Sequence, residues 1–428
     1  MKKLLIISYF YPPANFVGAQ RTAAWAKYLH EYGYYPIVIT RQWNEGQTDL
    51  VDKVKKNELE IEKNNTHEVH RLPYKYSLRD RLANYPAVKV FQKALTLKEL
   101  VLSNYSIKQL PFSNFYAYSK NLIQKDSEIN IVIASGRPFQ AFFIGHQLKK
   151  DFPRIHWVPD YRDEWNTRGT IRSNSFLRNQ LLTFEQKSEK KWVSNSTLFL
   201  SVSDFWVKNI GAFIGVPGKK ILNGFDQENE TKTLGKNIPK SNNKIKILYM
   251  GSVYTYQDFS VLLQSIKQLV NSSALEIEIT FLGSYANKRE LNYLNSLFKE
   301  YRGFVRLEPK VRKDQVVDFI NNSDLLFVTE YKGLNGCLPV KIFDYYNSDK
   351  PILLCPSDND LMENFIKETN SGYIANTKDE CVAILEKLIQ LKKEAKPLIG
   401  PRNNQNALFY SRKYQTKVLA GYLDSLFE

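Results

Sequence analysis

Residues 338–357 read LPVKIFDYYNSDKPILLCPS and contain a helical pattern followed by a strand pattern, the alternation that decides the fold. A helix-sized segment opens at Pro339 and stops before Pro351, and the apolar run after Pro351 is typical of a short buried strand. Lys341 and Asp344 are one helical turn apart and share a face, while the apolar residues around them can cover the packed side. This polar face is either a solvated ion pair or the side of the helix that meets a ligand.

The same alternation of short apolar runs with helical patterns extends along the whole chain. It predicts parallel strands covered by helices on both faces, which is an α/β fold with doubly wound parallel sheets. Helices fit between most of the runs, for example at residues 19–33, 138–152 and 179–193. The expected strands are residues 3–10, 35–41, 67–72, 129–135, 155–161, 196–202, 219–224, 245–252, 275–284, 304–309, 323–331, 351–357 and 372–376.

A polar segment divides the chain into two predicted domains. Residues 226–244 are poor in apolar side chains and are interpreted as a linker. A chain of 428 residues with 43% hydrophobic content exceeds the size of one core, so we expect domains at residues 1–225 and 245–405. Ligands of doubly wound sheets bind at the carboxyl ends of the strands, so functional residues are expected in the loops that follow them.

Composition limits the class of protein and its compartment. No segment approaches the ~18 consecutive apolar residues that a spanning helix needs. The three cysteines show neither paired spacing nor zinc-ligand spacing, which favours a reducing compartment. We therefore expect a cytoplasmic protein, and a peripheral position on the inner face of the cytoplasmic membrane stays open.

The net charge of +16 implies an anionic partner. Basic residues concentrate in an insertion at residues 75–125, where nine Lys or Arg residues face two acids among many aromatic residues. This mixture suits an anionic membrane surface, and the alternative is a solvated helical insertion whose aromatic residues are core. Nucleic acid is not the expected partner, because no RNA- or DNA-binding signature accompanies the charge.

Seven segments occur in the order and spacing seen in one enzyme family. They are ISYFYPPANFVGAQR (7–21), SGRPFQ (135–140), WVPDYRDEW (157–165), LFLSVSDF (198–205), ILNGFD (221–226), ILYMGSVY (247–254) and LPVKIFDYYNSDKPIL (338–353). With these segments the chain resembles bacterial retaining glycosyltransferases of the GT-B fold, and looks most like the family 4 enzymes that build capsule and lipopolysaccharide chains.

The resemblance implies two facing Rossmann-like domains, with the nucleotide sugar held mainly by the second and the acceptor mainly by the first. It also implies that a final helix within residues 406–428 crosses back to the first domain. The implied activity is a metal-independent, hexosyltransferase-type transfer from a nucleoside diphosphate sugar to a hydroxyl of a saccharide or lipid-linked saccharide in surface polysaccharide synthesis. No cofactor is implied.

The resemblance also implies a donor site around the helix that begins at Pro339. Exposed N–H groups near Pro339, with the charge of Lys341, would meet the diphosphate, and Asp344 would bind the ribose hydroxyls. Lys332 is a further candidate for neutralising phosphate. The expected donor-binding residues are Gly251, Ser252, Arg312, Leu338, Pro339, Lys341 and Asp344.

The sequence departs from the family at this site. Many members carry two glutamates eight positions apart, where this chain has Gly336 and Asp344. An Arg/Lys pair that is usual after the first strand of the second domain is replaced by Ser252 and Gln257. Two alternatives therefore stay open: a sugar-nucleotide-binding protein without turnover, and a membrane- or nucleic-acid-binding protein driven by charge.

In the first domain, the segment DYRDEW at residues 160–165 concentrates opposite charges at the end of an apolar strand. We expect Asp163 to contact the acceptor hydroxyl as base or orienter with Arg162 holding it, and Asp160 is the second candidate. The alternative is a structural network of arginine and acids.

The loops after neighbouring strands supply the expected acceptor-binding residues, and an ordinary βα turn with Arg21 in solvent is the alternative there. These residues are Gly18, Arg21, Ser135 and Arg137. Asp358 and Asp360 imitate an Asp-x-Asp metal site, but we expect them to cap the following helix, and no metal site is predicted.

Overall fold

The chain divides into two compact units in a computed structural model. Unit 1 comprises Met1–Asn223 and Arg412–Glu428, and unit 2 comprises Gly224–Ser411. Each unit is an α/β sandwich around a largely parallel sheet, so the predicted fold class is confirmed. The described residues are 1–47, 52–82, 85, 88–110, 112–168, 175–226, 244–272, 276–285, 287–311 and 313–428.

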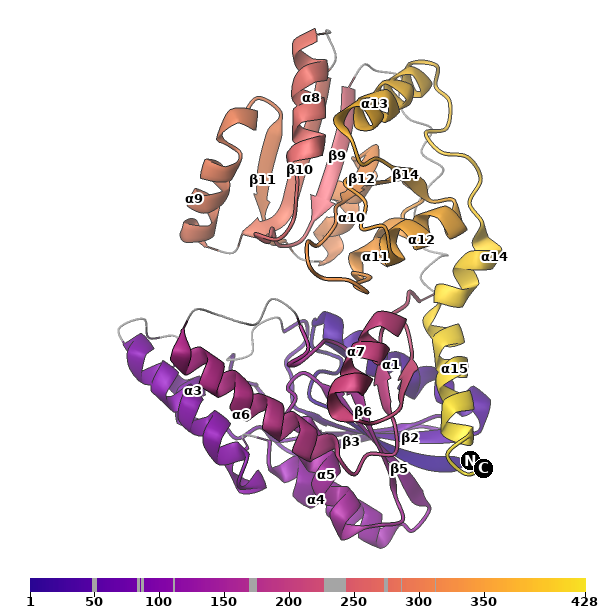
Figure 1. The fold of residues 1–428 in the computed structure, drawn as a ribbon. Coiled ribbons are helices and arrows are strands. Elements are labelled where there is room, and N and C mark those ends of the chain that lie inside the picture. Colours follow the sequence, from indigo (N-terminus) through magenta and orange to yellow (C-terminus); the bar gives the residue numbers. More distant parts are fainter. Residues whose placement is uncertain are drawn as a thin grey trace. The chain divides into compact units, whose positions relative to one another are not determined.

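The sheet of unit 1 has the strand order β3-β4-β2-β1-β5-β6-β7-β8 (Figure 1). β3 pairs antiparallel with β4, and the other pairs among the described residues are parallel. β1 is central and buried on both faces, which explains its continuous apolar sequence. The strands are β1 Lys2–Ser8, β2 Tyr34–Arg41, β3 Glu60–Lys63, β4 Glu68–Leu72, β5 Ile129–Gly136, β6 His156–Tyr161, β7 Phe199–Ser201 and β8 Gly218–Lys220.

Helices cover both faces of this sheet. Alternate residues of β1, such as Leu4 and Ile6, share a core with Trp25 of α1 and Leu419 of α15. α5 packs against β5 and β6 and contacts α4 and α6. The helices are α1 Val17–Tyr28, α2 Leu78–Leu82, α3 Lys89–Ser103, α4 Asn114–Lys125, α5 Ala141–Asp151, α6 Phe176–Val193, α7 Asp204–Ile214 and α15 Arg412–Asp424, with short 3-10 helices η1 Leu29–Tyr32 and η3 Ile107–Gln109.

The sheet of unit 2 is parallel and has the strand order β11-β10-β9-β12-β13-β14. The order reverses direction beside β9, and the loops after β9 and β12 therefore leave the sheet next to each other. The strands are β9 Lys244–Met250, β10 Glu276–Tyr285, β11 Val305–Pro309, β12 Leu325–Val328, β13 Ile352–Leu354 and β14 Gly372–Ile374.

Two hydrophobic clusters lie on the two faces of this second sheet. Odd residues of β9, such as Ile247, pack with α8, α9 and α13, whereas Leu248 packs with α10, α11 and α12. Thr377 and Glu380 form a capping box that starts α13. The helices are α8 Ser260–Ser272, α9 Lys288–Leu297, α10 Lys313–Asn321, α11 Lys341–Tyr346, α12 Leu361–Thr369, α13 Lys378–Lys393 and α14 Asn404–Ala407, with η5 Lys299–Tyr301 and η6 Leu408–Tyr410.

The structure differs from the sequence analysis at several elements. β3 was not expected, because its sequence is polar and its residues are largely exposed. α11 has six residues, shorter than expected, because Ser348 donates to the Tyr345 carbonyl and Asp349 has a positive φ of 56°. None of the described helices is both long and apolar enough to cross a membrane.

Candidate functional site

Two residues predicted to bind the donor, Gly251 and Lys341, lie together at the carboxyl end of the unit 2 sheet. Gly251 follows β9 with φ of +98°, a conformation that glycine adopts without strain. Its N–H donates to the Leu282 carbonyl at 2.8 Å, which fixes the turn. A Cβ at this position would lie 3.7 Å from Nζ of Lys341, so the ammonium lies directly over the main chain of the turn.

The Lys341 ammonium has an unusual environment. Nζ lies 4.0 Å from the centre of the Tyr249 ring. Among the described residues it has no hydrogen-bond acceptor and no carboxylate partner, so the ion pair with Asp344 considered above does not form. Burial lowers the pKa of Lys341 from 10.5 to about 7, and Cys337 acts weakly in the opposite direction. The site therefore contains a partly buried lysine whose ammonium has no anionic partner among the described residues.

The start of α11 adds hydrogen-bond donors next to this lysine. Pro339 and Val340 accept from the N–H groups of Ile342 and Phe343 at 3.1 and 3.0 Å, so the first turn begins at Pro339. Within the described part of the chain, the N–H groups of Val340 and Lys341 have no acceptor.

The remaining predicted donor residues differ in exposure. Asp344 is exposed one turn after Lys341, and Leu338 is buried in the core beneath α11. The Ser252 carbonyl accepts from the Tyr249 hydroxyl at 2.9 Å, so its main chain is already engaged. Arg312 lies outside the described residues.

Gln257, which departs from the family pattern, and Lys332, a candidate for neutralising phosphate, are both engaged in internal contacts. The Gln257 amide bonds the Tyr249 hydroxyl at 2.8 Å and the Tyr254 N–H at 2.9 Å. Lys332 forms an ion pair with Asp258 at 2.8 Å. Lys332 is therefore already neutralised by a carboxylate, in contrast to Lys341.

In unit 1, Arg21, Ser135 and Asp160 form one buried network. Two guanidinium nitrogens of Arg21 contact Oδ1 of Asp160 at 3.0 and 3.2 Å, and Ser135 donates to Oδ2 at 2.8 Å. A third nitrogen of Arg21 donates to the Ile221 carbonyl at 2.8 Å. Asp160 is fully buried, so the structural network considered above is what forms, and Arg21 is not in solvent.

Arg162 joins three loops at the carboxyl edge of the same sheet. It donates to the carbonyls of Gly136 and Arg137, and its guanidinium lies over Gly18, where a Cβ would be 1.8 Å from Nη1. Burial lowers the pKa of Arg162. Glycine is therefore favoured at position 18 because the Arg162 guanidinium lies so close to it. Its backbone conformation is not the reason, since its φ is not positive.

Asp163 is held by a different arginine from the one expected. Arg137 lies 3.6 Å from Oδ2 of Asp163, and both side chains are about half exposed. Arg162 points to main-chain carbonyls, so the expectation that it holds Asp163 was wrong in geometry. The reason is that the loop after β5 brings Arg137 beside Asp163, which sequence spacing does not reveal.

A buried acid that the sequence analysis missed supports this loop. Oε2 of Glu189, on α6, accepts from Asn166 at 2.7 Å, and Glu189 is fully buried. Burial raises the pKa of Glu189 to about 7. The available signal was spacing, because Leu182, Glu189 and Trp192 recur at helical intervals that place the acid on the packed face.

Both aspartates of the Asp-x-Asp segment accept hydrogen bonds from main-chain N–H groups. Asp358 accepts from the N–H groups of Met362 and Glu363 at 2.9 and 3.1 Å and so caps α12 as expected. Asp360 instead accepts from the Gly336 N–H at 2.6 Å. In the part of the chain that the structure describes, no three His, Cys, Asp or Glu side chains form a group that could hold a metal ion.

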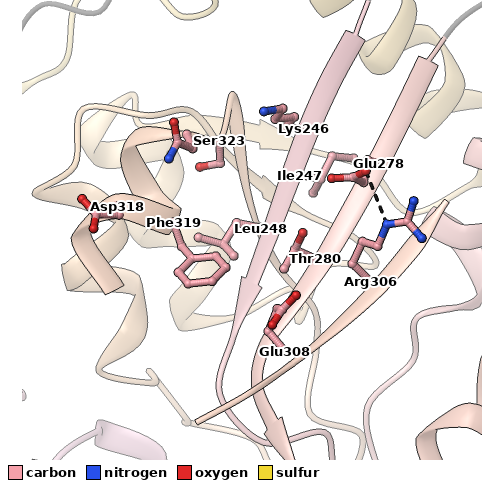
Figure 2. A pocket seen from close by; sticks show the side chains of 11 residues that line it. Lys246, Ile247, Leu248, Glu278, Thr280, Arg306, Glu308, Asp318, Phe319 and Ser323 are labelled. Carbon is pink, nitrogen blue, oxygen red and sulfur yellow. Dashed lines mark ion pairs between the residues drawn. The ribbon is translucent and has the colours of Figure 1, made fainter. Parts of the chain in front are cut away.

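A groove of about 560 Å³ lies on another part of unit 2, between α10 and the face of β9, β10 and β11 (Figure 2). Phe319 of α10 lies over Leu248, and Glu278 pairs with Arg306 across two strands at 3.6 Å. None of the predicted donor residues that the structure describes lines this groove. Among its described charged residues, Glu278 and Arg306 form the ion pair, and Glu308 and Asp318 add two further acids to the lining.

Comparison with known proteins identifies the fold. No family model matches the sequence, and no curated protein matches it. Among solved structures, sucrose-phosphate synthase from Thermosynechococcus elongatus has a TM-score of 0.63 at 13% identity, covering 100% of this chain and 99% of that one. Trehalose 6-phosphate synthase from Burkholderia multivorans has a TM-score of 0.59 at 9% identity, covering 100% and 99%.

A third similar structure contains ligands. HepE from Anabaena, solved in complex with UDP and glucose, has a TM-score of 0.59 at 13% identity, covering 99% of this chain and 100% of that one. Similarity over the full length of glycosyltransferase structures shows that this chain has the GT-B fold, as predicted.

Proposed function

We propose that this chain is a retaining, hexosyltransferase-type glycosyltransferase. It moves a sugar from a nucleoside diphosphate sugar to a hydroxyl of a saccharide or lipid-linked saccharide in surface polysaccharide synthesis. The observation that carries the proposal is the Lys341 ammonium, which is partly buried and has no anionic partner among the described residues. The complexes of HepE with UDP and with UDP-glucose support a nucleotide sugar as the ligand class.

The donor diphosphate provides the anion that Lys341 lacks. Its oxygens accept from the ammonium and from the free N–H groups of Val340 and Lys341, and Gly251 lets the ligand approach the main chain closely. Asp344, exposed on the same helix, binds the ribose hydroxyls through its two oxygens.

Lys341 acts on the reaction through charge. Breaking the glycosidic bond leaves negative charge on the departing diphosphate, and a preorganised cation nearby stabilises that charge. Because the pKa of Lys341 is depressed to about 7 without a ligand, an adjacent diphosphate raises it and keeps the ammonium charged at neutral pH.

Unit 1 supplies the acceptor residues in this proposal. Asp163 is the carboxylate that contacts the acceptor hydroxyl, because Asp160 is fully buried and already paired with Arg21. Arg137 lies beside Asp163 and orients it. Arg162 is a positioning residue that fixes the loop on which Asp163 lies.

Nucleotide binding and transfer test the proposal directly. The purified chain is titrated calorimetrically with UDP-, ADP-, GDP- and TDP-sugars, and donor hydrolysis is followed by chromatography with and without EDTA. We expect one saturable site, slow release of nucleoside diphosphate that is insensitive to EDTA, and loss of binding in Lys341→Met. Absence of heat with every nucleotide sugar, or activity that requires a divalent cation, would contradict the proposal.

A sugar-nucleotide-binding protein without turnover is the second candidate. It is favoured by Gln257 and Gly336, which stand where many family members carry charged residues and are here engaged in internal hydrogen bonds. Saturable binding of a nucleotide sugar with neither hydrolysis nor transfer, in the presence of candidate acceptors, identifies this alternative.

A further inference from the structure

Helix α3 presents an apolar stripe to solvent. Val90 is 84% exposed and Leu97 is 38% exposed, and Ala94 between them is also exposed. The spacing of four and three residues places all three on one face of the helix. α3 packs against α2 and η3 and lies at the periphery of unit 1, away from the sheet (Figure 1).

The opposite side of α3 faces the protein. Ser103 is buried, and Leu95 and Leu102 are partly covered. The outward stripe is therefore additional to the packed face of this helix. Scattered exposed apolar residues are ordinary, but a contiguous stripe along one helix marks an interaction surface.

The exposed charged residues that flank the stripe are basic. A rotation of about 100° per residue places the exposed Lys93 on one shoulder of the stripe and the exposed Lys98 on the other. Residues 75–125 contain only two acids, Asp80 and Glu99, and both are engaged by Arg79, at 3.3 and 3.1 Å. The outward face of α3 is therefore apolar at its centre and cationic at its margins.

We propose that α3 docks this protein on the surface of an anionic lipid bilayer. Val90, Ala94 and Leu97 enter the boundary between headgroups and acyl chains, and Lys93 and Lys98 extend to the lipid phosphates. A second copy of this chain fits the stripe less well, because pairing two such faces brings lysines of the same charge together. The docking surface does not depend on the proposed donor chemistry.

Flotation with lipid vesicles tests this proposal on the full chain. We expect binding to vesicles of phosphatidylcholine with 30% phosphatidylglycerol, weak binding to phosphatidylcholine alone, and release in 0.5 M NaCl. Val90→Gln with Leu97→Gln should lower partitioning at least tenfold, and Lys93→Gln and Lys98→Gln about fivefold each. Leu297→Gln changes a leucine of similar exposure, 45%, on α9 and should leave partitioning unchanged.

Three outcomes would overturn the proposal. They are equal binding to neutral and anionic vesicles, unchanged partitioning of the double variant Val90→Gln with Leu97→Gln, and a dimer that this double variant dissociates in sedimentation equilibrium. Thermal unfolding of each variant confirms that it is folded. Calorimetric titration of the same variants with nucleotide sugars separates failure of the membrane proposal from failure of the donor proposal.

Discussion

Replacing Lys341 with methionine should stabilise the unliganded protein while removing donor binding. The two side chains have similar length, so the variant removes the charge and keeps most of the packing. Burial lowers the pKa of Lys341 from 10.5 to about 7, and this difference corresponds to about 5 kcal/mol of unfavourable free energy for the buried charge. Allowing for partial solvation, we expect Lys341→Met to gain about 2 kcal/mol, or about 4–8 °C in Tm.

The pH dependence of the stability difference between Lys341→Met and the wild type tests whether the charge of Lys341 is its cause. The unfolded chain binds this proton more tightly than the folded chain, so the destabilising effect is complete below pH 7 and diminishes as pH rises toward 10.5. The Tm difference between Lys341→Met and the wild type should therefore be largest at pH 6 and smaller at pH 9. Differential scanning calorimetry at both pH values measures it.

The same proteins are also measured in the presence of a nucleoside diphosphate. A nucleoside diphosphate at 100 times its Kd should stabilise the wild type by about 2.7 kcal/mol and leave Lys341→Met unchanged. Lys332→Met is the matched control, because Lys332 is exposed and already paired with Asp258, and it should change the Tm little. A Lys341→Met variant that unfolds at a lower temperature than the wild type and still responds to the nucleotides would refute the reasoning.

Three further substitutions test the supports of the unit 1 site. Gly18→Ala places a methyl group against the guanidinium of Arg162 and should cost about 1–3 kcal/mol, measured by urea unfolding. Arg21→Ala leaves Asp160 charged and unpaired in the core and should cost about 3–5 kcal/mol by the same method. Glu189→Gln should not change stability near pH 4 but should gain about 2 kcal/mol at pH 8, because a folded pKa of about 7 makes the wild type lose stability as pH rises from 4.5 to 7.

Control variants and a pH series separate the proposed causes from a general loss of stability. Gly421→Ala lies in α15 with open space around the added methyl group and should be stabilising by about 0.5–1 kcal/mol, unlike Gly18→Ala. Adding Asp160→Asn to Arg21→Ala should recover part of the loss, because no lone charge remains. A Glu189→Gln variant whose stability runs parallel to the wild type from pH 4 to pH 8 would show that this acid does not titrate in that range.

Local sequence determined the architecture of both units. Apolar runs such as residues 4–7 and 247–250 are typical of central parallel strands, and the helical patterns between the runs fix the crossover connections. These signals are local, because the period of apolar residues depends on only a few neighbours along the chain. The expected strands accordingly match the observed sheets, and only the polar edge strand β3 escaped the pattern.

The sequence also indicated which loops would carry the charged residues, but not how these residues pair. Arg21 with Asp160, Arg137 with Asp163, and Asn166 with Glu189 are each joined across different secondary structure elements. Side-chain reach and burial decide such pairs, and both depend on residues far apart in the chain.

Tertiary structure alone decided the state of Lys341. The sequence placed it one turn from Asp344, which is equally compatible with a solvated ion pair. Packing of α11 against β9 instead brings its ammonium over Gly251 and the Tyr249 ring, without a carboxylate among the described residues. The free energy of a charge depends on the solvent and ions around it, and these are known only once the chain is folded.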